Sequence, residues 1–408
     1  MPPPPEKSTL VNKSHSTKVP IKNGMRPFRT LFLAALFAVC LVSPCSVSFA
    51  YAGKHSITEY SFGEWFTEPN PIEIYTLTNV HGLQVRILNF EGIIQSIRVP
   101  DRDGNFDDIV LGFDHIEPYF TNGPHFGSVV GRYATRIASG KPSLDGVERR
   151  LPGNDGPNTL PGPAKGLEKV LWRAQPSEKK DEVILSLACT SQDGQEGLSG
   201  TLNARVTYVL NDSDELIIDY SATADKPTVV NLTSHGYFNL AGQGKGDILG
   251  HELMINADRF TPVDSDMNPT GELRPVEGTP LDFRTTTPIG ARIQDRYEQL
   301  VLAGGYDHYF VINRKKSEMA LAARVHEPST GRILEIYTSD PGVQFYSGNW
   351  LDGTLPGKQG RVYKKHYGFA LETERFPDSP NHPSFPSTVL KTGKTYHSRT
   401  VYRFSTDK

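Results

Sequence analysis

The sequence predicts an all-β protein with a sandwich or barrel-like architecture. From Ser56 onward, short segments alternate between apolar and polar residues, and turn-forming residues separate them at short intervals. No long stretch in this region has the spacing of apolar residues that is typical of an amphipathic helix. Residues 201–210 and 216–224 alternate cleanly on either side of a polar turn, which predicts a long hairpin with one face in solvent.

The individual strands follow from the same alternation. Residues 101–105 read Asp-Arg-Asp-Gly-Asn, which is a hairpin turn of the Asp-Gly kind. A brief helix is expected near residues 288–297. The expected strands cover residues 72–78, 83–88, 93–99, 201–210, 216–224, 320–325, 333–338, 343–346 and 396–404, with a further strand around Val311.

The first fifty-two residues differ in composition from the rest of the chain. Residues 1–25 are rich in Pro, Ser and Lys and have no periodicity, which predicts a disordered leader. Arg26 and Arg29 then precede an apolar run, and Ala50-Tyr51-Ala52 matches a small-x-small cleavage site. We therefore expect a secretory signal over about residues 26–52.

This interpretation divides the chain into a leader with a signal, residues 1–52, and one domain, residues 53–408. It predicts a secreted or periplasmic protein that has no stable membrane association once the signal is cleaved. A single N-terminal membrane anchor is the alternative, because residues 31–52 are just long enough to span a bilayer. Pro44 interrupts that run and favours the cleaved signal.

Composition disfavours several classes of function. The 408-residue chain has a formal net charge of −3 and no Arg-rich run, which argues against nucleic acid as a partner. Its cysteines are Cys40, Cys45 and Cys189, too few for a disulfide framework or a cysteine zinc site. The histidines lack metal-ligand spacing and no Gly-rich nucleotide motif occurs, so neither a metal site nor a nucleotide site is expected.

One carboxylate stands out near the C-terminus. The apolar segment 367–371 runs directly into Glu372, and a Pro-rich segment follows at 376–386. A carboxylate at the end of a buried strand is costly to remove from water. Glu372 is therefore expected to have a partner or a chemical task.

His235 and Asp307 are the next candidates for chemistry. His235 follows a β-branched segment that ends in small polar residues, and aromatic residues come after it. A neutral imidazole exchanges protons near neutral pH, although a histidine at a strand end is also an ordinary structural residue. Asp307 is either a turn residue or a ligand for sugar hydroxyls. His366 and His382 are interpreted as structural.

Arg132 and Arg136 lie among small residues at 126–138. A guanidinium in such a place pairs with a carboxylate or binds oxygens of a ligand, and the pairing is the commoner case. Together, one carboxylate, one imidazole, an Arg and an Asp suit acid–base chemistry on a polyhydroxylated ligand. These residues alone do not identify the reaction.

Eight blocks of sequence resemble the aldose 1-epimerase (galactose mutarotase) family in order and spacing, from about Pro71 to the C-terminus. They include Arg-Tyr-Ala-Thr-Arg-Ile at 132–137 and Pro-Gly-Val-Gln-Phe-Tyr at 341–346. The resemblance implies a large antiparallel β-sandwich of the galactose-mutarotase type, a supersandwich, with a concave sugar-binding face. The other blocks are 157–160, 231–240, 260–264, 281–284, 304–308 and 368–386.

The resemblance also implies an activity and residue roles. It implies interconversion of the α and β anomers of free aldoses such as glucose and galactose, without a cofactor or metal. Glu372 matches the general base that takes the proton of the anomeric hydroxyl, and His235 matches the general acid that protonates the ring oxygen. Arg136, Asp307 and Gln344 match the contacts to sugar hydroxyls. The implied partner is a small-molecule aldose, and the protein is expected to be a monomer or a dimer.

Two positions depart from the family pattern. Thr135 stands where Asn usually precedes the binding Arg, so a hydroxyl replaces an amide. Pro161 stands where the family has a second sugar-contacting histidine, and proline has neither a side-chain donor nor a backbone N–H. These departures keep two alternatives open: a sugar-binding protein with little turnover on the same fold, and a mutarotase for sugar phosphates. Tyr237 and Tyr346 are interpreted as core residues rather than as walls of the site.

Overall fold

Alternating side chains along the chain produce the largest sheet of the protein. The computed structural model describes residues 53–64, 71–121, 124–140, 142–144, 147–148, 151, 158, 166–315 and 318–407. Nine strands form this sheet, and each neighbouring pair is antiparallel. Their order is β18 (Thr287–Pro288), β15 (Glu252–Ile255), β20 (Ala320–Glu327), β21 (Arg332–Thr338), β25 (Thr395–Thr406), β12 (Glu215–Ala224), β11 (Leu202–Asn211), β10 (Glu182–Ser191) and β9 (Arg173–Lys179).

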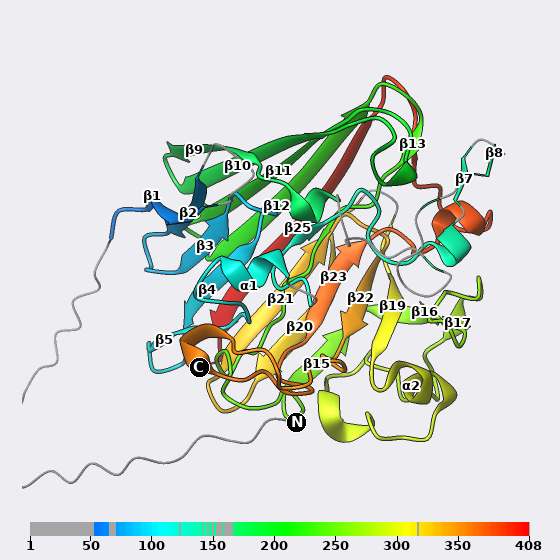
Figure 1. Ribbon diagram of the computed structural model, residues 1–408. Coiled ribbons are helices and arrows are strands. Elements are labelled where there is room, and N and C mark those ends of the chain that lie inside the picture. Colours follow the sequence, from blue (N-terminus) through cyan, green and yellow to red (C-terminus); the bar gives the residue numbers. More distant parts are fainter. Residues whose placement is uncertain are drawn as a thin grey trace, which may run out of the picture. The chain divides into compact units, whose positions relative to one another are not determined.

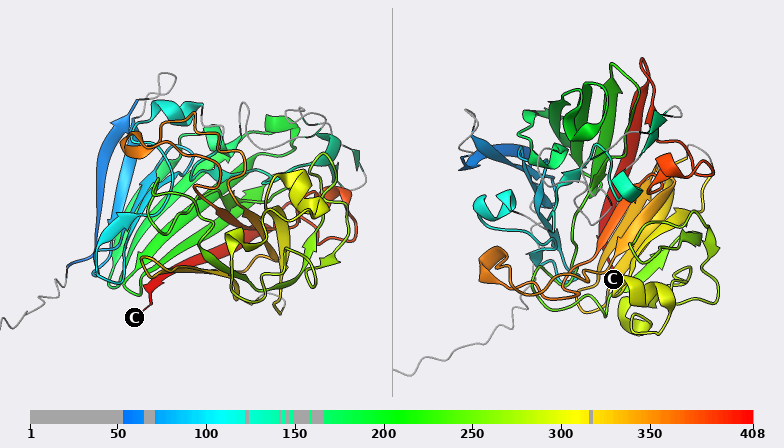
Figure 2. Two further views of the ribbon diagram at one scale, coloured as in Figure 1. Left: turned by 90° about the horizontal axis from the view of Figure 1, so that it is seen from below. Right: turned by 45° about the vertical axis from the view of Figure 1, so that its right-hand side comes forward.

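Two antiparallel sheets of five strands complete the main architecture. The first contains β1 (Ser56–Gly63), β2 (Ile72–Thr78), β3 (Gln84–Leu88), β4 (Ile94–Pro100) and β5 (Phe106–Asp108). The second has the order β17 (Arg274–Pro275), β16 (Ala257–Thr261), β19 (Asp307–Ile312), β22 (Gly342–Tyr346) and β23 (Ala370–Glu374). In the right-hand view of Figure 2 the blue-to-cyan first sheet and the yellow-to-orange second sheet lie on opposite sides, with green strands of the largest sheet between them.

Short ladders and helices make up the rest. The ladders are β6 (Val129–Val130) with β14 (Thr233–Ser234), β13 (Thr228–Val229) with β24 (Val389–Leu390), and β7 (Ser143–Leu144) with β8 (Val147–Glu148). The α-helices are α1 (Glu117–Phe120) and α2 (Glu298–Ala303), and 3-10 turns cover Ala138–Gly140, Leu167–Lys169, Gln195–Gly197, Ile289–Ala291, Lys358–Gly360 and Ser379–Asn381. Figure 1 shows these elements along the chain.

One apolar core joins the three large sheets. Val85 on β3, Val206 on β11 and Phe345 on β22 are all fully buried in the same cluster. Because inward-facing and outward-facing side chains alternate along β11 and β12, this hairpin buries one face and leaves the other in solvent, as predicted. The all-β sandwich class is thereby confirmed.

The segment after β14 connects the two five-stranded sheets. Phe238 forms a β-bridge to Val110, which follows β5, and another to Phe369, which precedes β23. The Thr233 hydroxyl donates a hydrogen bond of 3.0 Å to the carbonyl of Thr373 on β23. These links place the residue between them, His235, beside β23.

Two expectations concern the ends of elements and the leader. The helix expected near residues 288–297 is wrong in position: a 3-10 turn covers Ile289–Ala291, and α2 begins at Glu298 and ends before Gly304. Gly304 has a φ of 66°, which suits the residue that ends a helix.

The leader and the expected signal, residues 1–52, lie outside the described residues. Residues 51–408 form one compact unit. Among the described helices, none is long and apolar enough to cross a membrane.

Candidate active site

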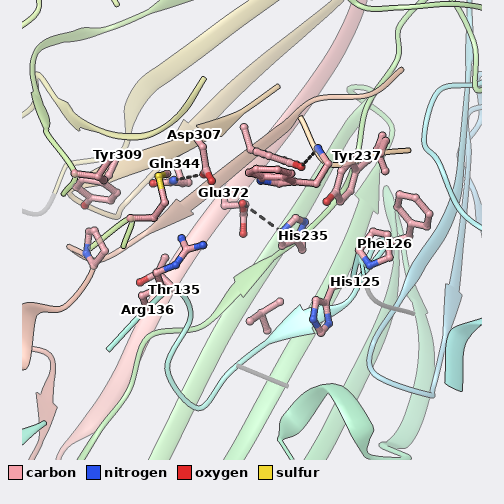
Figure 3. A pocket seen from close by; sticks show the side chains of 18 of the residues that line it. His125, Phe126, Thr135, Arg136, His235, Tyr237, Asp307, Tyr309, Gln344 and Glu372 are labelled. Atoms are coloured by element: carbon pink, nitrogen blue, oxygen red, sulfur yellow. Dashed lines mark hydrogen bonds and ion pairs between the residues drawn. The ribbon is translucent and has the colours of Figure 1, made fainter. Parts of the chain in front are cut away.

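A cavity of about 560 Å³ opens over one face of the second five-stranded sheet. Its size lies within the range of about 300–1,000 Å³ that is usual for small-molecule sites. Side chains from β16, β19, β22 and β23 line one wall, and the loops that contain His125, Arg136 and His235 line the others. Figure 3 shows these side chains around the cavity.

The strand register brings a row of polar side chains to the floor of the cavity. Thr261 pairs with Tyr309, Tyr309 with Gln344, and Gln344 with Glu372. Successive side chains of a strand point to opposite faces, so Asp307 faces the same side as Tyr309. All five residues line the cavity.

Glu372 lies in the middle of β23, not at the end of a strand as its sequence context indicated. The residue is only 7% exposed, and no hydrogen bond from its carboxyl group to a described residue is formed. Burial, with a smaller effect from the nearby charge of Asp307, raises the pKa of Glu372 to about 8. The carboxyl group is therefore held in an environment where it releases a proton near neutral pH.

His235 lies at the end of β14 and is fixed by its backbone. Its N–H donates to the carbonyl of Ser128, and its carbonyl accepts from the N–H of Gly127, both at 2.9 Å. Its ring stacks on Tyr237, with ring centroids 5.0 Å apart and an angle of 19° between the planes. Burial, together with the neighbouring His125, lowers the pKa of His235 to about 3.

Glu372 and His235 meet across the cavity, although they are 137 positions apart in the chain. The distance from Nε2 of His235 to Oε1 of Glu372 is 3.6 Å, marked by a dashed line in Figure 3. This distance is longer than a direct hydrogen bond, so both groups stay available to a ligand. Burial raises the pKa of Glu372 and lowers that of His235, so it favours one proton on the pair near neutral pH, held by Glu372.

The remaining predicted binding residues surround this pair. The amide of Gln344 donates a hydrogen bond of 2.6 Å to Asp307, which fixes that carboxylate. Burial raises the pKa of Asp307, and both Arg136 and Gln344 oppose that shift. Arg136 and Thr135 line the cavity, and the Thr135 hydroxyl is buried without a hydrogen-bond partner among the described residues. A carboxylate, an amide and a guanidinium together can hold several hydroxyl groups of a sugar.

Two aromatic residues that sequence reasoning assigned to the core also line the cavity. Tyr237 and Tyr346 are buried in an apolar cluster, and their ring centroids lie 5.9 Å apart. Both contribute to the wall around His235 and Glu372. The core interpretation is therefore incomplete, because each ring packs on one side and faces the cavity on another.

Other candidates have structural roles. Arg132 was expected to pair with a carboxylate or to bind a ligand, but its guanidinium donates to the hydroxyl of Ser191 and to carbonyls such as that of Gly200 at 2.8 Å. Nδ1 of His366 donates to the carbonyl of Ser347 at 2.7 Å. Pro161 lies outside the described residues.

Sequence reasoning missed His125, which lines the cavity beside His235. It also missed Thr261, whose hydroxyl is buried without a partner among the described residues. No motif or spacing marks His125, and the resemblance of the block at 260–264 gave Thr261 no role of its own. Across the described residues, no group of three or more His, Cys, Asp or Glu side chains is arranged to hold a metal ion.

Known proteins are similar to this chain in sequence and fold. The family model described as aldose 1-epimerase matches residues 73–403. The chain belongs to the aldose 1-epimerase family. A galactose mutarotase from Rattus norvegicus is 45% identical over 350 residues, which cover 86% of this chain and 99% of the relative. An aldose 1-epimerase from Escherichia coli (strain K12) is 38% identical over 336 residues, 82% of this chain and 95% of the relative.

A solved structure gives the same result for the fold. The GalM/aldose epimerase homologue from C. elegans superposes with a TM-score of 0.72 at 30% identity, covering 87% of this chain and all of that chain. The galactose-mutarotase type of β-sandwich implied by the sequence resemblance is therefore confirmed.

The role of Asp307 in setting the pKa of Glu372 leads to a prediction. Asp307→Asn keeps an oxygen that accepts from Gln344 but removes the negative charge. We expect the pKa of Glu372 to fall in this variant and to stay above the ordinary value of about 4.3, because burial is the larger cause. The measurement is a ¹³C NMR titration of the side-chain carboxyl group. An unchanged or higher pKa would show that the two carboxyl groups do not interact.

Proposed function

We propose that this protein interconverts the α and β anomers of free aldoses by opening and closing the pyranose ring, with Glu372 and His235 as the groups that move protons. The observation that carries the proposal is their arrangement. A carboxyl group and an imidazole face the same sugar-sized cavity and lie 3.6 Å apart. Membership in the aldose 1-epimerase family supports the same reaction.

Ring opening requires two proton transfers. Glu372, as the carboxylate, takes the proton of the hydroxyl on C1, while protonated His235 gives a proton to the ring oxygen O5. The C1–O5 bond breaks, its electron pair stays on O5, and the C1–O1 bond becomes a carbonyl. The pair still holds one proton, which has moved from His235 to Glu372.

Ring closure uses the opposite distribution of that proton. After rotation about the C1–C2 bond, neutral His235 takes the proton from the hydroxyl on C5 and protonated Glu372 gives one to the carbonyl oxygen. This distribution is the one that burial favours in the free site. Attack on the other face of the carbonyl gives the other anomer, and each half of the reaction leaves one proton on the pair.

The polar floor holds the sugar while its reactive end turns. Asp307, fixed by Gln344, and Arg136 offer hydrogen bonds to hydroxyl groups remote from C1. Without such contacts an open-chain aldehyde would leave the cavity. Glucose and galactose are the proposed substrates, since curated relatives carry the name galactose mutarotase.

Two alternatives differ in measurable ways. A sugar phosphate needs cationic partners, and among the described residues that line the cavity Arg136 is the one Lys or Arg. A sugar-binding protein with little turnover is motivated by Thr135 and Pro161, which depart from the family pattern. The presence of both proton-transfer groups in one cavity favours the enzyme.

Removing the base should abolish catalysis. We expect Glu372→Gln to lower the rate of anomerisation of fresh α-D-galactose and α-D-glucose by about 10²–10⁴-fold, because an amide does not accept the C1 hydroxyl proton as a base does. Polarimetry measures the rate, and calorimetry should still detect sugar binding. Glu277→Gln, at a side chain that is 80% exposed, is the control and should retain the wild-type rate.

Two results would contradict this assignment. A wild-type rate in Glu372→Gln would remove Glu372 as the base. Anomerisation by the wild-type protein at the uncatalysed rate for every aldose, with sugar binding intact, would favour the binding protein.

The proposed reaction needs one proton on the pair of Glu372 and His235, so its rate should depend on pH. Because the pKa of Glu372 is raised to about 8, the pair keeps its proton below that pH and loses it above. We expect kcat/KM to be flat between about pH 5 and 7 and to fall about tenfold per pH unit well above 8. The measurement is polarimetry after subtraction of the uncatalysed rate at each pH. An enzymatic rate that keeps rising to pH 10 would rule out the shared proton.

We further propose that the protein is secreted or periplasmic. The basic flank, short apolar run and Ala50-Tyr51-Ala52 site support this localisation. Expression of the full chain in a secreting host should give a mature protein whose N-terminus, found by mass spectrometry, is Gly53. Retention of residues 26–52 on a membrane-bound protein would favour the single anchor instead.

A further inference from the structure

A second imidazole belongs to the cavity wall. His125 lines the cavity, and its ring centroid is 6.4 Å from that of His235, with an angle of 38° between the planes. In Figure 3 His235 lies between Glu372 and His125. At this separation one bound sugar can reach both rings.

The position of His125 is fixed relative to His235 by the backbone. The hydrogen bonds that fix His235 go to Gly127 and Ser128, and the N–H of Ser128 also donates to the carbonyl of His125 at 3.2 Å. His125 has a φ of 56°, a left-handed conformation that is uncommon for a residue other than glycine. Such conformations persist where the surrounding structure holds them and are frequent at functional sites.

The side chain of His125 has unused hydrogen-bonding capacity. Its Nδ1 is buried and has no hydrogen-bond partner among the described residues. Partial burial, helped by the positive charge of Lys169, lowers the pKa of His125 to about 4, so the ring is neutral at physiological pH. A neutral imidazole both donates and accepts hydrogen bonds, as a sugar hydroxyl does.

The order of the three groups identifies the part of the sugar that reaches His125. In the proposed reaction O1 lies at Glu372 and O5 at His235, which sets the direction of the C1–O5 bond across the cavity. His125 lies on the far side of His235 from Glu372. The atom attached to O5 on the side away from C1 is C5, and in a hexose C5 carries the hydroxymethyl group.

We propose that His125 is a specificity residue that hydrogen-bonds the C6 hydroxyl of a hexose and favours hexoses over sugars that lack that hydroxyl. This inference rests on the proposed function, because it uses the placement of O1 and O5. His125 binds the substrate and takes no part in the proton transfers at C1 and O5.

A comparison of D-galactose with D-fucose, which differs only in lacking the C6 hydroxyl, tests the proposal. We expect the wild-type protein to have a kcat/KM for D-galactose about 3- to 10-fold above that for D-fucose, the effect of one neutral hydrogen bond. In His125→Asn, which tolerates the left-handed backbone, and in His125→Phe, which fills the space without a donor, this ratio should fall to near one. Polarimetry gives all the rates.

The ratio separates a contact with O6 from damage to the structure, because misfolding slows both sugars equally. The control is His115→Asn, at an exposed histidine outside the cavity lining, which should keep the wild-type ratio. A wild-type ratio near one, or a wild-type ratio that persists in both His125 variants, would overturn the proposal. Failure of the proposed function looks different, since the wild-type protein would then accelerate neither sugar.

Discussion

The arrangement of the site depends on one constraint: a carboxyl group and an imidazole are both buried in one water-poor cavity. Desolvation penalises the ionised form of each group, raising the pKa of Glu372 and lowering that of His235. The pair therefore keeps one proton over a wide range of pH. In ring opening and again in ring closure, the sugar gives one proton to the pair and receives one from it. Such a reaction is suited to this pair, because the number of protons bound by the two side chains stays constant.

The sandwich provides this arrangement through antiparallel register. Glu372 lies in the middle of β23, where its neighbours on β22 and β19 supply Gln344 and Asp307 on the same face. His235 comes from a different part of the fold, and the bridges of Phe238 together with the hydrogen bond from Thr233 to Thr373 hold its segment against β23. A strand gives Glu372 a more rigid support than a mobile loop would.

Much of the fold could be predicted from the sequence, because alternation of apolar and polar residues is a local signal. The strand β2 covers the predicted residues. Each end of β11 is shifted by one residue from its prediction, and β12 begins one residue earlier than predicted and ends where predicted. The helix predicted near residue 290 lies further along the chain, as α2. Residues 289–291 form a 3-10 turn instead, and a second turn follows at Arg292. Helix ends depend on such local backbone geometry more than on pattern.

The candidate site was predictable only where a charged residue stood in an apolar segment or where the sequence matched a family. Glu372 was recognisable as a charge in an apolar strand, and its partner came from the resemblance rather than from spacing. Arg132 was expected to pair with a carboxylate or to bind a ligand, yet its guanidinium donates to backbone carbonyls. Nothing in a sequence shows which carbonyls lie near a given side chain. His125 was missed for the same reason: its importance comes from tertiary contact with a residue 110 positions away.

A crystal structure of Glu372→Gln with bound D-galactose tests the central claim most directly, because this variant should bind the sugar without turning it over. The account predicts that O1 lies within hydrogen-bond distance, about 2.6–3.2 Å, of the residue 372 side chain and that O5 lies equally close to Nε2 of His235. A sugar whose anomeric carbon lies away from both side chains would contradict it.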